Sequence, residues 1–586
     1  MKTDSIPRPE YPRPQFVRDH WINLNGTWQF LMDMDNRGLA RNLFQTEQFL
    51  RENPCEITLP FCPESRLSGI GYTDFIPAVW YRRTVEIGDD CLTGRVILHF
   101  GAVDFHTLVW VNGRRAGEHT GGYASFSLDV TKLLYAGENE IILYAEDDNQ
   151  SRLQPCGKQS ITRHSQGCSY TRTTGVWQTV WLEFLPTDYI RHAKITPLVQ
   201  NEQVLVQLES QGGRTVSAQV CLNGEIISKG SAPIVGGQAV MMLSIPNPVL
   251  WDIGQPNLYD LILTLDTGDC VKSYFGMRSV DVRTNGLYLN GRPLFMRTIL
   301  DQGFYPEGIC TAPNDADLKH DIELSMELGF NGARFHQRAF EERSLYWADK
   351  LGYIIWAESA INPIRTKTEA FPQMLAEWIE IMSRDYNHPC IIGWIPENET
   401  YWRGDTLNRD NQLTLWQVTK QLDPYRPAID ASGGVHFDTD MFDVHDYNQD
   451  PVALRQSLAC MTDDPEAYHN PITNEIGRLN QYKGQPYWVS EYGGTFWNPE
   501  ESDGWGYGNI PQSEEEFAKR YVGLTAVLQE NPRICGFCYT QLTDIEQEQN
   551  GLYKYDRTRK FTDAVYDQIR EANRAPSAME TKQLED

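Results

Sequence analysis

The feature that most constrains the fold is a change of pattern near residue 282, where strand-like runs begin to alternate with amphipathic helical runs. We expect strands at 293–303, 331–336, 353–360, 390–398, 427–433, 441–447, 487–494 and 534–544. Helical patterns lie between them, for example at 315–329 and 515–530. Eight strands that alternate with helices predict a (β/α)8 TIM barrel over residues 282–575. A doubly wound open sheet is the alternative, but the Gly-rich phosphate turn expected of it does not occur.

The chain before the barrel reads as β-structure alone. Short apolar runs separated by turn signals over residues 1–190 predict a β jelly roll or sandwich. Residues 191–281 repeat this pattern in a smaller unit, which predicts an immunoglobulin-like β-sandwich. Residues 576–586 predict a polar tail. The predicted fold class is therefore multidomain, with a β jelly roll, an immunoglobulin-like β-sandwich and a C-terminal (β/α)8 TIM barrel.

Asn-Gly dipeptides mark candidate hairpin turns in the two β-rich units. They occur at Asn25-Gly26, Asn112-Gly113 and Asn223-Gly224. Both central residues of a type I′ turn need a positive φ, which Asn and Gly adopt more readily than other residues. We therefore expect a β-hairpin at each of these three positions.

Charge and hydropathy exclude several classes of function. Lys and Arg number 52 and Asp and Glu number 79, a net charge of −27, so we expect no nucleic-acid binding. No apolar run is long enough to span a membrane, and the first residues lack the apolar core of a secretory signal. The twelve cysteines are scattered, and the pair Cys535 and Cys538 lacks the second pair that a zinc site would need. We expect a cytoplasmic protein with reduced thiols and no membrane segment.

Acids stand at the ends of two strands predicted to be buried. The fourth barrel strand ends in a run that contains both Glu397 and Glu399, and the seventh contains Glu491. Active sites of TIM barrels lie at the C-terminal ends of the strands. Cleavage of a glycosidic bond uses two carboxylates, one to protonate the leaving oxygen and one as nucleophile or base. A glutamate that pairs with arginine for structural reasons would give the same signal, so this alternative stays open for either acid alone.

The chain resembles glycoside hydrolase family 2 over almost its whole length. The segment HPCIIGWIPENET (388–400) is similar to the acid/base signature of that family, in which the catalytic Glu directly follows an Asn. The segment YWVSEYGG (487–494) is similar to the nucleophile signature. The resemblance implies that Glu399 is the acid/base and Glu491 the nucleophile. Glu397 occupies a position before the Asn that is usually not acidic.

The resemblance also implies a retaining mechanism and further residues of the site. The segments NGARFHQ (331–337) and 344–358 are similar to the second and third strands of the family barrel, so Arg334 and His336 carry over as active-site residues. Arg334 would keep Glu491 ionised, and Asn398 would donate to the sugar 2-hydroxyl. Glu399 must start protonated, so we expect its pKa to be raised.

Other candidates for the pocket lie at strand ends and beside the catalytic motifs. They are His445, Tyr447, Asp301, Glu358, Gln541, Asp544, Trp394, Trp402 and Trp497. A packed or purely structural role stays open for each. Gly493 and Gly494 are expected to let the sugar approach the backbone. Whether the first-domain loop 168–175 reaches the pocket, as such loops do in relatives, is open.

The sugar is less constrained than the chemistry. Family members that cleave glucuronides usually carry an Asn-x-Lys pair, and here Asn550 is followed by Leu552. The leading hypothesis is an exo-acting retaining β-galactosidase-like enzyme whose substrate is a small oligosaccharide or glycoside. A β-galacturonide, glucuronide, mannoside or arabinoside as substrate, or a non-catalytic carbohydrate-binding protein, are the alternatives. We expect no metal and no cofactor, and a homo-oligomer, common among relatives, is open.

Overall fold

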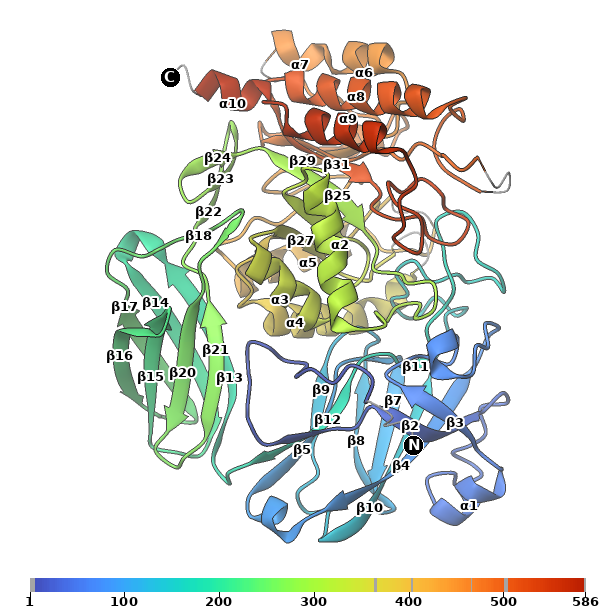
Figure 1. The fold of residues 1–586 in the computed structure, drawn as a ribbon, viewed down its shortest axis with the longest axis vertical. Coiled ribbons are helices and arrows are strands. Elements are labelled where there is room, and N and C mark those ends of the chain that lie inside the picture. Colours follow the sequence, from blue (N-terminus) through green and yellow to red (C-terminus); the bar gives the residue numbers. More distant parts are fainter. Residues whose placement is uncertain (1–5, 363–365, 402–403, 465, 500–503, 584–586) are drawn as a thin grey trace.

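A computed structural model of the protein describes residues 6–362, 366–401, 404–464, 466–499 and 504–583. Two β-rich units precede an α/β barrel, and Figure 1 shows the first unit below the barrel and the second beside it. No helix in these ranges has the length and apolar character needed to cross a membrane. All twelve cysteines lie within them and are free thiols.

The first unit is a sandwich of two antiparallel sheets, as the sequence predicts. One sheet has the strand order β3-β2-β4-β10-β7-β8 and the other β1-β12-β5-β9. The side chains between the sheets form one apolar core, which buries rings such as Trp28, Tyr81 and Phe100. The elements are β1 Trp21–Asn23, β2 Gly26–Met32, α1 Thr46–Arg51, β3 Cys55–Leu59, β4 Ala78–Ile87, β5 Arg95–Phe100, β6 Val103–Asp104, β7 His106–Val111, β8 Arg114–Thr120, β9 Phe126–Asp129, β10 Gly137–Glu146, β11 Gly175–Val176 and β12 Val180–Leu185.

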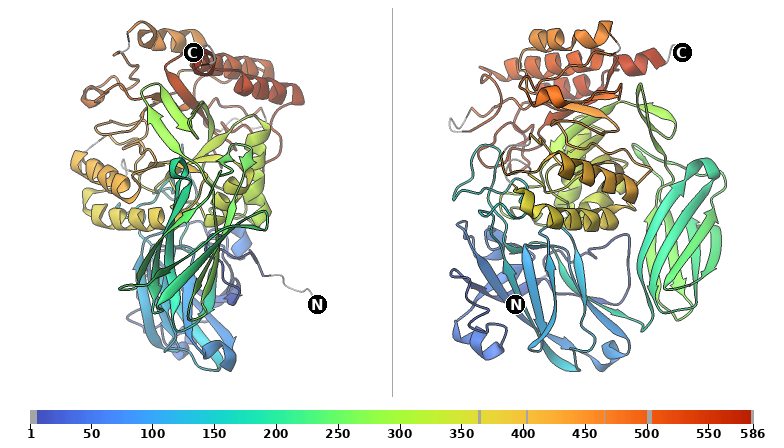
Figure 2. Two further views of the ribbon diagram at one scale, coloured as in Figure 1. Left: turned by 90° about the vertical axis from the view of Figure 1, so that its left-hand side faces the viewer. Right: turned by 180° about the vertical axis from the view of Figure 1, so that it is seen from behind.

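The second unit is a smaller sandwich of sheets β13-β14-β17 and β16-β15-β20-β21. Strand β17 alternates strictly between exposed and buried residues, which is how a strand with one solvated face reads in sequence. Figure 2 shows this sandwich standing apart from the first along most of its length. The elements are β13 Tyr189–Leu198, β14 Gln203–Gln211, β15 Thr215–Leu222, β16 Glu225–Pro233, β17 Gln238–Ser244, β18 Trp251–Asp252, β19 Gln255–Pro256, β20 Tyr259–Leu265 and β21 Cys270–Phe275.

Two of the three predicted hairpins are confirmed. Asn112-Gly113 joins β7 to β8 and Asn223-Gly224 joins β15 to β16, all four residues having positive φ. The prediction at Asn25-Gly26 is wrong, because β1 pairs with β12 whereas β2 pairs with β3 and β4. The buried Asn25 side chain instead donates to Pro7 O at 3.0 Å and Thr179 Oγ1 at 3.1 Å, and accepts from the Val180 backbone. It fixes a strand crossing between the two sheets.

The third unit is a barrel built on seven parallel strands in the order β28-β27-β26-β25-β31-β30-β29. Its elements, after the meander β22 Val280–Arg283, β23 Gly286–Leu289 and β24 Arg292–Leu294, are β25 Met296–Asp301, α2 Asp315–Glu327, β26 Gly332–Phe335, α3 Glu342–Leu351, β27 Ile354–Glu358, α4 Phe371–Asp385, β28 Ile391–Ile395, α5 Arg409–Leu422, β29 Phe442–Asp446, α6 Pro451–Leu458, α7 Cys460–Asp463, β30 Tyr487–Gly493, α8 Glu514–Glu530, β31 Ile534–Thr540, α9 Asp563–Arg574 and α10 Ala578–Gln583. The mouth formed by the strand C-termini faces loops of the first unit.

The fifth predicted strand, 427–433, forms no ladder. It makes only two single bridges. Ala428 pairs with Trp394 in β28, and Ser432 pairs with Asn398 after β28. Side-chain contacts toward β29 replace the missing backbone bonds, since Ser432 Oγ donates to Asp443 at 2.5 Å. This segment therefore lies between the two edge strands and completes the wall of the barrel without being a regular strand.

Residues 576–586, expected to form a polar tail, include the helix α10. Met579 is buried against Gly286 of the meander, and both oxygens of Glu580 accept from Arg297 at 3.0 and 2.7 Å. The C-terminal segment thus packs onto the end of the barrel opposite the mouth.

The second sandwich is joined to the barrel through Asp349 on α3, which is fully buried. Its carboxylate accepts from Tyr274 of β21 at 2.8 Å, from His388 at 2.6 Å, and from the Cys390 backbone at 2.8 Å. His388 and Cys390 lead directly into β28, the strand that precedes Glu399. One carboxylate therefore bonds both to the second sandwich and to the start of β28.

We predict that Asp349→Ala lowers the free energy of unfolding by about 3–5 kcal/mol, because it leaves buried donors without an acceptor. The midpoint and slope of urea unfolding measure this. Tyr274→Phe is the matched control, since it removes only one of the hydrogen bonds and should cost about 1 kcal/mol. Equal losses in the two variants would show that Asp349 is not the hub of this joint.

Candidate active site

The two predicted catalytic acids lie together at the barrel mouth. Glu491 stands on β30, and Glu399 follows β28, held by a backbone hydrogen bond from its N–H to Ser432 O at 2.8 Å. Glu399 has a φ of 52°, a left-handed conformation that non-glycine residues seldom adopt. Carboxylate oxygens of the two acids lie within 4.8 Å of each other. This spacing is close to the separation of about 5–5.5 Å typical of retaining glycosidases.

Arg334 of β26 contacts Glu491 and Asn398, the residue before Glu399. Its guanidinium is fully buried and donates to Glu491 Oε1 at 3.0 Å, to Glu358 Oε1 at 2.7 Å and to Asn398 Oδ1 at 3.0 Å. It also donates to Ser490 O at 2.8 Å. Because the oxygen of the Asn398 amide faces Arg334, its NH2 group is the donor that it can offer to a substrate.

Glu491 is held as a carboxylate. Burial alone would raise its pKa, but electrostatic attraction to His445 and Arg334 lowers it. Tyr447 Oη donates to the second oxygen, Glu491 Oε2, and also contacts Thr540 Oγ1 at 3.1 Å. The Tyr447 ring stacks on Tyr507, with centroids 3.5 Å apart. The carboxylate is therefore oriented at both oxygens.

The expectation of a raised pKa for Glu399 is wrong for this arrangement. Burial would raise the pKa, but His445, whose Nδ1 lies 2.9 Å from Glu399 Oε1, and the charge of Lys158 lower it to about 2. His445 Nε2 lies 3.3 Å from Glu491 Oε1, so the imidazole bridges the two acids. In the free site the contact with His445 therefore favours the ionised form of Glu399.

Glu397 is not part of this group. Its side chain is buried, and Thr400 Oγ1 donates to it at 2.7 Å. Burial raises the pKa of Glu397 to about 8. A neutral acid in a closed environment matches the sequence-based assignment of the catalytic role to Glu399.

Glu358 and His336 support the site. Glu358 accepts from Arg334, and its other oxygen lies 3.0 Å from His336 Nδ1 and 3.1 Å from the Gln337 backbone nitrogen. Burial would raise the pKa of Glu358, but Arg334 and His336 lower it. Its oxygens are thus engaged by the protein, so Glu358 orients Arg334 and His336.

Asp301 is not brought to the catalytic acids. It pairs in register with Phe335, whereas Leu300 pairs with the inward-facing Arg334, and successive side chains on a strand point to opposite faces. Its Oδ1 accepts from the Gly303 backbone at 2.9 Å, and burial with the nearby Asp321 charge raises its pKa to about 7. The structure gives Asp301 a place outside the barrel lumen.

Trp394, Trp497 and Asp544 are each packed against or bonded to other side chains of the protein. Trp394 is fully buried and donates to Asp423 at 2.8 Å, and Trp497 packs against Phe561 in the apolar core. Trp402 lies outside the described residues. Asp544 pairs with Lys560 at 2.6 Å.

Gly493 and Gly494 make room for tyrosine rings. A Cβ on Gly493 would lie 2.3 Å from the Tyr539 ring, and one on Gly494 would lie 2.6 Å from the Tyr507 ring. Both glycines also have positive φ. The tyrosine rings give a structural reason for both glycines, and the expectation that they let the substrate approach the backbone stays a prediction.

The first-domain loop 168–175 does reach the barrel mouth. Tyr170 Oη donates to Glu548 and accepts from Gln302 at 2.8 Å. Gln302 also donates to Gln541 at 2.6 Å, Gln541 to Asn550 at 2.8 Å, and Asn550 to Glu548 at 3.0 Å. The five side chains form a closed ring of hydrogen bonds, in which Gln541 has its place. The side chain of Leu552, two residues after Asn550, is buried.

Sequence reasoning missed three residues of the mouth, Lys158, Tyr507 and Glu548, and it singled out the loop that carries Tyr170 without naming that residue. Lys158, Tyr507 and Glu548 lie in loops without a recognisable motif, and none follows a predicted barrel strand directly. The charge of Lys158 acts on both Glu399 and Glu491, and Glu548 lies within electrostatic range of Glu491. Lys158 and Tyr170 come to the site through the tertiary contact between the first unit and the barrel.

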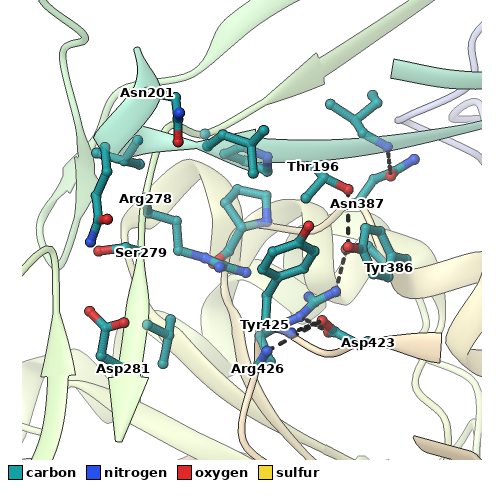
Figure 3. Close-up of a pocket in the computed structure, with 18 residues that line it drawn as sticks. Thr196, Asn201, Arg278, Ser279, Asp281, Tyr386, Asn387, Asp423, Tyr425 and Arg426 are labelled. Carbon is teal, nitrogen blue, oxygen red and sulfur yellow. Dashed lines mark hydrogen bonds and ion pairs between the residues drawn. The ribbon is translucent and has the colours of Figure 1, made fainter. Parts of the chain in front are cut away.

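A separate cavity of about 300 Å³ lies where the second sandwich meets the barrel. Figure 3 shows Arg278, Tyr425 and Arg426 around it, with Arg426 paired to Asp423. Arg278 donates to Pro389 O at 2.7 Å and Ile391 O at 2.8 Å, carbonyls at the start of β28. This cavity therefore lies at the end of the barrel opposite the catalytic acids.

Three models of one family match the chain in succession. They are the glycosyl hydrolases family 2 sugar binding domain at residues 70–153, the glycosyl hydrolases family 2 domain at 189–278, and the glycosyl hydrolases family 2 TIM barrel domain at 280–523.

Among curated proteins, a putative beta-glucuronidase of Formosa agariphila is 30% identical over 69% of this chain and 50% of its own length. A beta-galactosidase of Thermoanaerobacter pseudethanolicus is 24% identical over 71% of this chain and 54% of its own length. The chain thus spans about half the length of these two relatives.

Solved structures share the fold over 97% of this chain. A beta-glucuronidase of Ruminococcus gnavus has a TM-score of 0.78 at 16% identity and is covered over 99% of its length. A GH2 beta-galacturonidase of Eisenbergiella tayi has a TM-score of 0.75 at 18% identity and is covered over 98%.

We predict that Glu397→Gln gains stability relative to the unmodified protein as the pH rises from 5 to 8. The folded chain holds the Glu397 proton up to about pH 8, whereas the unfolded chain releases it near the ordinary value of 4.5. The free energy of unfolding of the unmodified protein should therefore fall across this window by on the order of 1.4 kcal/mol per pH unit. The Glu397→Gln variant has no proton to release at this position, so it should not show that fall. Urea unfolding at several pH values measures the difference.

The exposed Glu118 supplies the matched control for this experiment. Glu118→Gln should show a difference in unfolding free energy that does not change with pH. A difference that is equally flat for Glu397→Gln would contradict the assignment of a neutral Glu397.

Proposed function

Because the chain belongs to glycosyl hydrolase family 2, we propose that it is a retaining β-glycosidase that releases single sugars from the non-reducing end of small glycosides. Glu491 acts as the nucleophile and Glu399 as the acid/base. The observation that carries this proposal is the pair of carboxylates within 4.8 Å at the barrel mouth, with Glu491 held by Arg334 and Glu399 by His445. A carbohydrate-binding protein without activity would not need a nucleophile fixed at both oxygens.

In the first step, a Glu491 oxygen attacks the anomeric carbon as the bond from that carbon to the leaving oxygen breaks. Glu399 gives its proton to the leaving oxygen, so the aglycone departs as a neutral alcohol. In the second step, water attacks the same carbon, Glu399 takes the proton from that water, and the bond to Glu491 breaks. Two inversions leave the β configuration in the product.

Glu399 must carry a proton when the leaving oxygen departs. In the free site His445 Nδ1 lies 2.9 Å from Glu399 Oε1, and this contact lowers the pKa of Glu399. The leaving oxygen of a bound substrate competes with His445 for the same carboxylate. Loss of the contact with His445 removes an interaction that favours the ionised form of Glu399.

The contacts that line the barrel mouth support cleavage at the end of a sugar chain. The first-domain loop that carries Tyr170 is bonded to the loop after β31, where Thr171 N–H donates to Glu546 at 3.1 Å and Gln547 Nε2 to Gly167 O at 2.7 Å. This contact closes one side of the mouth, so a polymer would not pass across it. Location in the cytoplasm and assembly into oligomers stay predictions.

The sugar belongs to one of two groups. Relatives of similar sequence are named as a beta-galactosidase and as beta-glucuronidases, and a structure of the same fold as a beta-galacturonidase. We therefore propose a β-galactoside or a β-hexuronide as the substrate.

We predict that Glu399→Gln loses activity strongly on glycosides with poor leaving groups but still forms the glycosyl-enzyme from dinitrophenyl glycosides, which need no acid. Added azide should then restore turnover by at least about tenfold, because a small anion attacks without a general base. Initial rates with and without azide, over a panel of β-glycosides, measure this.

Glu397→Gln serves as the control and should change these rates by less than about threefold, since Glu397 is already neutral and makes no contact with the other two acids. If Glu397→Gln were the more damaging change, or if azide failed to act on Glu399→Gln, the roles given to the two residues would be incorrect.

A further inference from the structure

Lys158 lies on a segment of the first unit that is bound to the barrel from two sides. The Gly157 N–H donates to Ala360 O at 2.8 Å, and Asn362 Nδ2 donates to Gly157 O at 3.2 Å, both partners being in the loop after β27. On the other side, Tyr170 N–H donates to Lys158 O at 2.8 Å. The backbone of Lys158 is thus fixed at the mouth.

Gly157 is needed for this approach. Its φ is 52°, and a Cβ at this position would lie 2.3 Å from Gln337 O, in the loop after β26. Any other residue would push the segment away from the barrel. Glycine at position 157 therefore allows the close approach that places the backbone of Lys158 at the mouth.

The half-buried Lys158 side chain lies within electrostatic range of Glu548, Glu399 and Glu491. Burial would lower its pKa, but attraction to the Cys168 thiol and to Glu548, Glu399 and Glu491 raises it, so the group is a cation. Within the described parts of the chain, its side chain makes no hydrogen bond or ion pair. Three N–H donors are therefore available to a bound molecule.

Three other cations in the described part of the chain, Arg334, Arg338 and Lys560, are already engaged by protein groups. Arg334 is engaged by Glu358, Glu491 and Asn398. Arg338 donates to Gly303 O at 2.6 Å and Cys310 O at 2.7 Å. Lys560 is paired with Asp544 at 2.6 Å and bonded to two carbonyls. Lys158 is the cation among these that can meet an anionic substrate.

We propose that Lys158 binds the carboxylate of a β-linked hexuronide and thereby selects this substrate over the corresponding neutral hexoside. The inference rests on the proposed glycosidase activity and narrows its substrate. A uronate adds a negative charge to a mouth that already holds Glu399, Glu491 and Glu548. That charge would be repelled without a cation, and an unpaired ammonium offsets the repulsion through a charge-assisted hydrogen bond.

The test compares two matched pairs of 4-nitrophenyl glycosides, β-D-galacturonide with β-D-galactoside and β-D-glucuronide with β-D-glucoside. Each pair differs only in the carboxylate at carbon 6. The unmodified protein should prefer one uronide over its neutral partner in kcat/KM. Lys158→Met should lower kcat/KM for that uronide by about 10- to 100-fold, mainly through KM, because one charged hydrogen bond is lost. The neutral partner should change by less than about threefold.

Two further variants separate this role from an effect on the charge of the site. Lys158→Arg should recover part of the lost preference, and Lys272→Met, which removes an exposed lysine far from the mouth, should change nothing. Rates are measured over a range of pH, because loss of Lys158 also raises the pKa of Glu399. An equal loss on the uronide and the neutral sugar, or a preference for the neutral sugar in the unmodified protein, would overturn the proposal.

A binding measurement keeps the two proposals separate. Titration calorimetry of Glu491→Gln with galacturonate, glucuronate, galactose and glucose needs no turnover. If uronates bind and Lys158→Met abolishes that binding, the role of Lys158 is supported even when no glycoside of the panel is hydrolysed. The absence of hydrolysis would then count against the proposed activity alone. Equal binding of uronates with and without Lys158 would refute it.

Discussion

The contact on which the rest of the site depends is the buried guanidinium of Arg334. A buried cation is destabilising unless hydrogen-bond acceptors replace the lost water. The guanidinium of Arg334 donates to Glu358, Glu491, Asn398 and a backbone carbonyl. These partners stand on or directly after β27, β30 and β28, so one cation sets the relative positions of three strand ends. Glu491, the proposed nucleophile, is oriented by the same interaction, which also lowers its pKa. Glu399, the proposed acid/base, is linked to Arg334 only through the neighbouring Asn398.

The barrel alone does not complete the mouth. Tyr170 and Lys158 come from the first unit, and Tyr170 enters the ring of hydrogen bonds with Glu548, Asn550, Gln541 and Gln302. Gly157 allows the contact by its positive φ and its lack of a side chain. On the opposite end of the barrel, Asp349 joins the second sandwich to the start of β28. Both β-rich units thus act on the position or the surroundings of the catalytic acids.

Much of this arrangement could be predicted from local sequence. Strand periodicity predicted the barrel, and the acids at strand ends pointed to the runs that contain Glu399 and Glu491, because a buried strand and the charged residues at its end are neighbours in the chain. The choice of Glu399 over Glu397 came from the family resemblance. The predictions that were wrong depended on contacts between residues far apart in the sequence. Asn25-Gly26 resembles a hairpin, but its amide is used between two sheets, and Asp301 resembles Glu358 in sequence but faces the other side of its strand. The lowered pKa of Glu399 required knowledge of His445, and Lys158 carries no motif.

The central claim is that Glu491 forms a covalent bond to the sugar. Incubation with 2-deoxy-2-fluoro-β-glycosyl fluorides of galactose, galacturonate and glucuronate would trap that intermediate, since fluorine slows its hydrolysis. Mass spectrometry of a digest should place the label on Glu491 in the segment 487–494, with Arg334→Lys labelled far more slowly and Lys272→Met unchanged. A label on Glu399, Glu397 or any other acid, or inactivation without a covalent adduct, would contradict this account.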